Sequence, residues 1–301
     1  MLKFATVLAA AALVVAPNVG LAKSARPKAS TLTLSVGAQY DTTHVYVAPE
    51  DFDRFMDAFV ATFGGTKSPQ GVFQVTPTPS QTISQLAYTP VGTISVFGFK
   101  TPIPHPFGVE RTGYLITDMD VALKAARANG ADVQVADFPD PIGRDAVVEW
   151  PGGVHMQLYW HAKAPRYEAL KTIPENRVYV SGDRADAFVK SWLGFSHGKV
   201  LSDDRDVPGV EIGIAGETFR RIRLQSGFGK ITVLVSKGHL PFPFGHEMTG
   251  YEVSSLPETL ERAKAAGVTV LVAPFTSGGR NATIVEFPGG YIAEIHSVAA
   301  H

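Results

Sequence analysis

Apolar and polar positions follow two kinds of pattern along the chain, one typical of strands and one typical of helices, and the two alternate in a fixed order. A β-rich stretch such as GYLITD (113–118) leads into a segment whose apolar residues approximate a 3.6-residue spacing, which is typical of an amphipathic helix. Gly130 and Gly267 end two such helices in the C-cap manner. Short strands follow, and then a hairpin with the turn residues Pro-Gly-Gly. The predicted order is strand, helix and three strands, or βαβββ.

This unit is repeated, and the repetition is the strongest signal in the chain. Residues 104–138 match residues 241–275, with Pro, Phe, Gly, Glu and Thr-Gly-Tyr in common at an offset of 137. Weaker copies precede them, because residues 44–65 resemble residues 177–198. The chain is therefore predicted to contain four βαβββ modules, and a polar stretch at 161–175 separates the first two from the last two.

Composition limits the class of protein. A chain of 301 residues with 45% hydrophobic content can build one large or two ordinary domains with real cores. Lys and Arg total 27 against 28 Asp and Glu, without a long basic run, so no nucleic-acid partner is expected. The chain has no cysteine, which excludes disulfides and thiolate metal sites.

The N-terminus predicts export. Residues 1–22 combine Lys3, an apolar stretch and small residues before Lys23, which is the pattern of a cleavable signal peptide. The apolar stretch is shorter than the roughly 20 residues of a membrane-spanning helix, so no membrane association is expected after cleavage. Residues 23–35 are predicted to be an unstructured leader. The mature protein is expected in the periplasm or outside the cell.

The repeated motif resembles the glyoxalase, bleomycin-resistance and extradiol-dioxygenase group, the vicinal oxygen chelate superfamily. It consists of a strand, a polar turn, a helix ending in A.A.GA.V, then Gly-Arg and a turn and strand ending in a glutamate. The resemblance implies an α+β fold in which four βαβββ modules pair into two half-open β-barrels. It also implies two glyoxalase-like domains, at 36–162 and 175–298.

Members of this group commonly hold a divalent metal on the concave face, with ligands on the first and last strands of a module. His44 stands seven residues before Asp51, as the first-strand ligand does in the family pattern. In the last strand of the fourth module the corresponding position is Glu294, and its counterpart in the second module is Gln157. The first-strand positions of the other three modules carry Arg111, Arg177 and Met248.

Two further histidines extend this set. A two-residue strand period would put His246 on the face of Met248, and His296 on the face of Glu294. If modules one and four paired, His44, His246 and Glu294 would share one cavity and could bind Fe²⁺, Mn²⁺ or Zn²⁺. Pairing of sequence neighbours would separate them, and we favour the first arrangement on chemical economy. The residues then expected to bind substrate are Arg111, Gln157, Arg177, Met248 and His296.

Structural explanations compete with each of these roles. A buried carboxylate needs compensation, and a salt bridge from Arg177 or Arg280 would serve Glu294 as well as a metal. His246 could simply line a loop, and His296 could be the exposed end of a strand. Tyr251 is either a core residue or a catalytic acid that faces the cavity.

Two functions follow. The first is a metal-dependent lyase, isomerase or ring-cleaving dioxygenase that acts on a small oxygen-rich molecule. The alternative is a metal-free periplasmic protein that binds or sequesters a small molecule, as the bleomycin-resistance branch implies. In both cases the partner is a small molecule, and the protein is expected to be a monomer or a homodimer.

Overall fold

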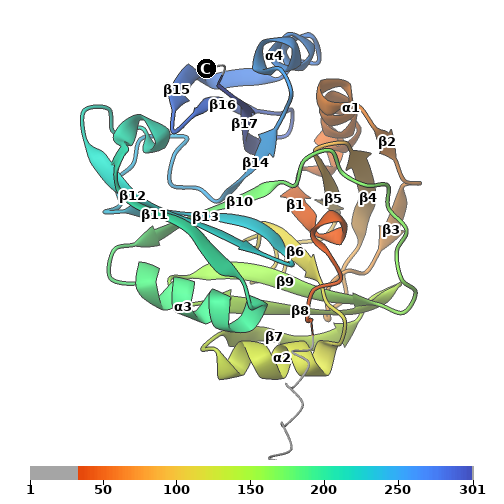
Figure 1. Ribbon diagram of the computed structural model, residues 1–301. Coiled ribbons are helices and arrows are strands. Elements are labelled where there is room, and N and C mark those ends of the chain that lie inside the picture. Colours follow the sequence, from red (N-terminus) through yellow and green to blue (C-terminus); the bar gives the residue numbers. More distant parts are fainter. Residues whose placement is uncertain (1–32, 300–301) are drawn as a thin grey trace, which may run out of the picture. The chain divides into compact units, whose positions relative to one another are not determined.

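The computed structural model describes residues 33–299, so the predicted signal peptide lies outside the described residues. Within that range the strands form two mixed sheets (Figure 1). The first sheet has the order β2-β4-β5-β1-β6-β9-β8-β7, with β3 paired to β4, and it contains the first two modules. Its strands are β1 (Thr42–Tyr46), β2 (Thr66–Lys67), β3 (Gly71–Phe73), β4 (Thr82–Thr89), β5 (Gly92–Phe99), β6 (Thr112–Leu115), β7 (Asp132–Pro139), β8 (Gly143–Trp150) and β9 (Val154–His161).

The second sheet has the corresponding order, β11-β12-β13-β10-β14-β17-β16-β15, and contains the last two modules. In each sheet the modules join through their first strands, because β1 pairs with β6 and β10 pairs with β14, both antiparallel. Its strands are β10 (Glu175–Ser181), β11 (Lys199–Pro208), β12 (Thr218–Ser226), β13 (Gly229–Ser236), β14 (Met248–Glu252), β15 (Thr269–Ser277), β16 (Arg280–Glu286) and β17 (Ile292–Val298).

One helix belongs to each module, and its ends are set by local sequence. Asp118 accepts a hydrogen bond from the Val121 amide (2.9 Å) and caps α2. Gly130 and Gly267 follow α2 and α4 with φ of 85° and 82°, which confirms their predicted role at the helix ends. The helices are α1 (Phe52–Phe63), α2 (Met119–Ala128), α3 (Ala185–Ser196) and α4 (Leu256–Ala265), and the short 3₁₀ turns are Ala38–Tyr40, Pro49–Asp51 and Gly209–Ile212.

The two large hydrophobic cores join modules from different sheets. α1 and α4 lie side by side (Figure 1), and Phe59 and Phe63 pack against Tyr251 and Phe287. The second core joins the second and third modules in the same way, with Trp150 5.5 Å from Trp192 between ring centroids. Each module therefore has two partners, one through its strands and one through its helix.

This arrangement corrects the favoured pairing of modules one and four around one cavity. Those modules share a hydrophobic core, but the sheets pair sequence neighbours. The four-module α+β fold is confirmed, and each sheet falls within one of the two predicted domains, 36–162 and 175–298. The division into two domains stays a prediction, because both cores are built from both halves.

The unstructured leader, predicted for residues 23–35, does not extend as far as residue 35. Leu34 is buried in a core, its carbonyl accepts a hydrogen bond from the Thr117 amide (2.8 Å), and Ser35 forms a β-bridge with Ile116. The rest of the leader, before residue 33, lies outside the described residues. None of the helices in residues 33–299 is long and apolar enough to cross a membrane.

Candidate functional site

The inner face of the first sheet encloses a cavity of about 340 Å³. Strand alternation directs Thr42, His44 and Tyr46 of β1 to this face, while Val45 points into the core behind. The cavity walls are largely aromatic and apolar, and Gln157 of β9 and Asp145 of β8 add polar groups. This is the composition expected of a small-molecule site.

His44 is 2% exposed, and the absence of a side chain at Gly113 makes room for its ring. A Cβ built on Gly113 would lie 2.5 Å from His44 Nε2 and 2.9 Å from Tyr159 Cε1. Gly113 pairs in register with Gln157 across β6 and β9. The imidazole therefore lies across β6, toward the strand that carries Gln157.

The other nitrogen of the ring faces a buried carboxylate. His44 Nδ1 lies 3.7 Å from Oε1 of Glu110, a residue with no exposed surface. Tyr46 donates a hydrogen bond to the same Glu110 oxygen, while Glu110 Oε2 and His44 Nδ1 have no hydrogen-bond partner in the described chain. Burial, with the charge of Glu110, raises the pKa of Tyr46 well above its ordinary value, so the phenol keeps its proton.

Asp145 of β8 belongs to the same lining and is 6% exposed. Burial and the charge of Asp140 raise its pKa well above the ordinary value, and a hydrogen bond from Gln157 lowers it only in part. Asp145 is therefore a carboxyl group that holds its proton beyond the usual pH range.

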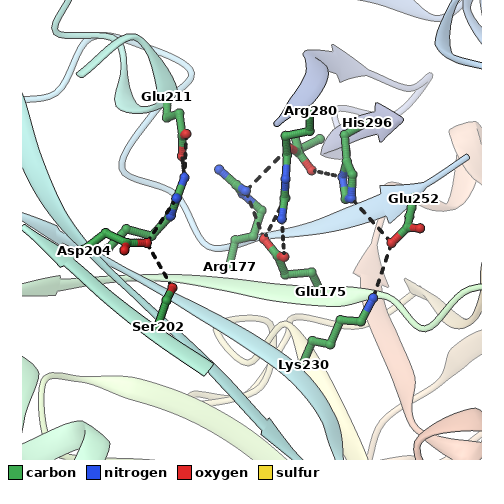
Figure 2. Close-up of polar contacts among 11 residues, drawn as sticks. Glu175, Arg177, Ser202, Asp204, Glu211, Lys230, Glu252, Arg280 and His296 are labelled. Carbon is green, nitrogen blue, oxygen red and sulfur yellow. Dashed lines mark hydrogen bonds and ion pairs between the residues drawn. The ribbon is translucent and has the colours of Figure 1, made fainter. Parts of the chain in front are cut away.

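The inner face of the second sheet carries a cluster of ion pairs (Figure 2). Arg177 Nη1 lies 3.0 Å from Glu175 Oε1 and 3.4 Å from Glu294 Oε1. Arg280 Nη2 lies 3.2 Å from Glu175 Oε2, and His296 Nδ1 lies 2.8 Å from Glu294 Oε2. Glu294 thus has the arginine partners that were the structural alternative to a metal.

The pKa values of this cluster follow from its charges. Burial alone would raise the pKa of Glu294, but the positive charges of Arg177 and His296 outweigh it and hold the pKa below its ordinary value. Burial likewise opposes ionisation of Glu175, and Arg280 and Arg177 lower its pKa strongly. Both carboxylates are therefore ionised and neutralised within the protein.

The predicted metal ligands are not brought together. Thr43 and Thr249 meet at 3.0 Å between their hydroxyl oxygens, where the two sheets approach each other. Their strand neighbours point the opposite way, so His44 faces the first cavity, and Glu294 lies against Gly250 on the inner face of the second sheet. The second sheet holds Arg177 and His296 with Glu294, whereas Gln157 lies with His44.

Three other predicted residues lie elsewhere. His246 is exposed in a bend before β14, so the strand period that placed it beside Met248 does not apply there. Met248 is buried among Phe244, Ile284 and other apolar side chains. Arg111 is half-buried and does not line the cavity; it lies near Glu247, whose pKa burial raises to about 8 against the lowering effect of that arginine.

Tyr251, the predicted catalytic residue, has no exposed surface. It belongs to the core between the first and fourth modules, and its hydroxyl lies 2.9 Å from that of Tyr291. It does not belong to the lining of the first cavity. Of the two roles considered for Tyr251, a core residue or a catalytic acid facing the cavity, its position is that of a core residue.

The predicted divalent ion requires about three protein ligands with an open position. Within residues 33–299 no three His, Asp or Glu side chains are grouped so as to hold a metal ion. In the first cavity two imidazoles, His44 and His161, and two carboxyl groups, Asp140 and Asp145, belong to the lining without forming such a group. In the second half the guanidinium groups of Arg177 and Arg280 already neutralise the carboxylates. These donor sets do not fit the ion, and a divalent metal stays a prediction.

Sequence reasoning missed Glu110, Tyr46 and Asp145. A signal for Glu110 was present, since the glutamate two positions before Thr-Gly-Tyr is repeated as Glu247. Asp145 follows Gly143-Arg144, which reads as a turn, and no pattern distinguished it.

Comparison with known proteins defines the fold. No protein-family model matches the sequence, and no curated protein sequence matches it either. A variant of 4-hydroxymandelate synthase from Streptomyces coelicolor superposes with a TM-score of 0.62 at 13% identity, over 89% of this chain and 94% of that one.

Two further solved structures are similar. The 2,3-dioxygenase LapB from a Pseudomonas species has a TM-score of 0.53 at 13% identity, over 88% of this chain and 94% of that one. A Mn(II)-bound glyoxalase from Novosphingobium aromaticivorans has a TM-score of 0.51 at 15% identity, over 88% of this chain and 83% of that one. Together with the two sheets of paired βαβββ modules, these likenesses establish that the chain has the vicinal oxygen chelate fold.

Proposed function

We propose that the chain is an enzyme of the vicinal oxygen chelate type that acts on a small molecule held in the cavity of the first sheet. The observation that carries this proposal is the buried His44, with Nδ1 toward Glu110 and its ring between Glu110 and the cavity. The names of the similar structures, a synthase, a dioxygenase and a glyoxalase, support an enzyme.

The arrangement supports proton transfer. With a hydrogen on Nδ1 directed to Glu110, the free Nε2 of His44 can take a proton from a bound carbon acid or hydroxyl group. A negative charge on Glu110, 3.7 Å from Nδ1, would then stabilise the imidazolium. The Gln157 amide belongs to the lining of the same cavity and can orient an oxygen of the substrate.

Deuterium uptake from D₂O into aryl α-hydroxyketones, followed by mass spectrometry, tests this step. We expect His44→Gln to slow exchange at least about 100-fold, the usual contribution of a general base. His155→Gln is the matched control, since His155 lies on β9 outside the cavity lining. Equal rates in the two variants would exclude His44 as the base.

The same assay, run with EDTA and with added MnCl₂, tests the predicted metal. Exchange that persists in EDTA is expected, because the described residues offer no three-ligand set. Exchange only after addition of Mn²⁺ would restore the metal-dependent enzyme.

The alternative, a metal-free binding protein, is favoured by this same lack of a ligand set. It predicts that aryl ligands protect the protein against thermal unfolding without any proton exchange. Export to the periplasm or beyond also stays a proposal, and the N-terminal mass of the mature protein from its native host tests it.

A further inference from the structure

The first cavity carries two carboxyl groups, of which Asp145 holds its proton before a ligand binds. Asp140 and Asp145 lie on one side, and the lining, as far as the described chain forms it, includes no lysine or arginine. Asp145 has no ion-pair partner within residues 33–299 and is 6% exposed. An anionic ligand would meet two carboxyl groups and no cationic side chain that could neutralise it.

The remaining lining suits an aromatic body. Tyr46 stacks on Phe97 with ring centroids 5.3 Å apart, and Phe97 also meets the His44 ring edge-on at 5.3 Å. The other aromatic residues of the lining are Phe73, Phe107, Tyr159 and Tyr167. Aromatic faces attract organic cations as well as other rings, and the attraction grows when water is excluded.

We infer that this cavity takes an aryl amine, with its ammonium group between Asp145 and Asp140 and its ring among the aromatic side chains. The inference rests on the proposed function, because it names the ligand class of the same cavity.

Binding of such a cation is coupled to a proton. Burial and Asp140 favour the protonated carboxyl at Asp145, so an ammonium group that binds there drives its ionisation. Burial lowers the pKa of His161 on the same wall, so that ring is neutral and does not compete with the cation. The other titratable groups that face the cavity are His44, Tyr46, Asp140, Tyr159 and Tyr167. Affinity for the amine should therefore rise with pH as Asp145 ionises.

Three probes of matched shape test the inference by calorimetric titration of the full protein: phenethylamine, phenethyl alcohol and hydrocinnamate. We expect phenethylamine to bind at least about tenfold more tightly than the alcohol, the hydrocinnamate anion to bind most weakly, and only the amine to gain affinity as pH rises. Asp145→Asn should remove the advantage of the amine and leave the affinity for the alcohol. Asp132→Asn, an exposed carboxylate on β7, should change neither.

The pH dependence of phenethylamine affinity is measured on the unmodified protein. It therefore tests the inference even if Asp145→Asn does not fold. Equal or tighter binding of the alcohol or of hydrocinnamate would overturn the aryl amine and leave the proposed cavity intact. Binding of no probe, together with deuterium exchange that depends on His44, would overturn the ligand class alone. Amine binding that is unaffected by Asp145→Asn and by pH would also overturn it.

Discussion

The two halves of the molecule share a module order and a sheet order, but their interiors differ. The first encloses a cavity of about 340 Å³ with a buried imidazole, whereas the second is crossed by ion pairs (Figure 2). The first-strand position carries His44 in one half and Arg177 in the other, and the last-strand position carries Gln157 and Glu294. A few side chains, and not the order of the strands, distinguish the two interiors.

The physical reason is charge compensation. Glu175 and Glu294 are almost fully buried, and two guanidinium groups compensate them. In the first half Asp145 has no such partner and keeps its proton instead. Paired charges therefore occupy the second interior, and neutral or weakly paired groups leave room for a ligand in the first.

Removal of Arg177 should have the largest effect. Arg177→Met leaves Glu175 and Glu294 with less positive charge beside them. We therefore expect the free energy of unfolding, measured in urea, to fall by about 3–5 kcal/mol. Arg144→Met is the matched control, because this partly exposed arginine pairs with Asp120 and Asp137 and should contribute less than about 1 kcal/mol. Similar losses in both variants would mean that the cluster does not stabilise the second half.

Repeat-related glycines offer a sharper comparison. A methyl group at Gly250 would lie 2.6 Å from Glu294 Oε2, so Gly250→Ala should lower the free energy of unfolding by about 1–3 kcal/mol. Gly113→Ala displaces His44 into open space, so it should slow deuterium exchange about 100-fold with a smaller loss of stability. If both variants lost only stability, the first half would have no special role.

Buried carboxyl groups in the two halves should make the free energy of unfolding depend on pH with opposite sign. The lowered pKa of Glu175 contributes stability above its unfolded value of about 4.3, and this is lost as pH falls through the folded value. The raised pKa of Asp145 contributes stability below about 3.9 that is lost as pH rises through the folded value. In urea unfolding from about pH 2 to about pH 8, Glu175→Gln should therefore lose stability relative to the wild type as pH rises toward about 4 and keep a constant difference above that. Asp145→Asn should gain stability relative to the wild type as pH rises above about 4. Parallel curves would contradict both assignments.

The smallest effect is expected from Tyr46→Phe. It removes the hydrogen bond to Glu110, worth about 0.5–1.5 kcal/mol, and should slow deuterium exchange by roughly 2- to 10-fold. Tyr291→Phe removes a comparable hydroxyl from the core at Tyr251 and should leave exchange unchanged. An unchanged rate in Tyr46→Phe would show that this phenol does not position Glu110.

The repeat allowed the four modules, their helices and the two sheets to be predicted, because strand and helix periods are local properties. The pairing of modules could not be predicted in this way, because each module contacts one module through its strands and a different one through its helix. Of the predicted site residues, His44 and Gln157 line one cavity, as the pairing of sequence neighbours implies and not as the favoured pairing of modules one and four does. Glu110 and Asp145 owe their roles to burial and to distant neighbours, which no local pattern records.

The crossed cores also determine what the covalent link between the halves does. Residues 162–174 carry no helix or strand, while both cores draw on both sides of that segment. A chain cut there should behave as two obligate partners that associate when produced together and expose apolar helix-bearing faces when produced apart. Gene duplication of a homodimer whose subunits already shared their cores would yield this architecture without any new contact.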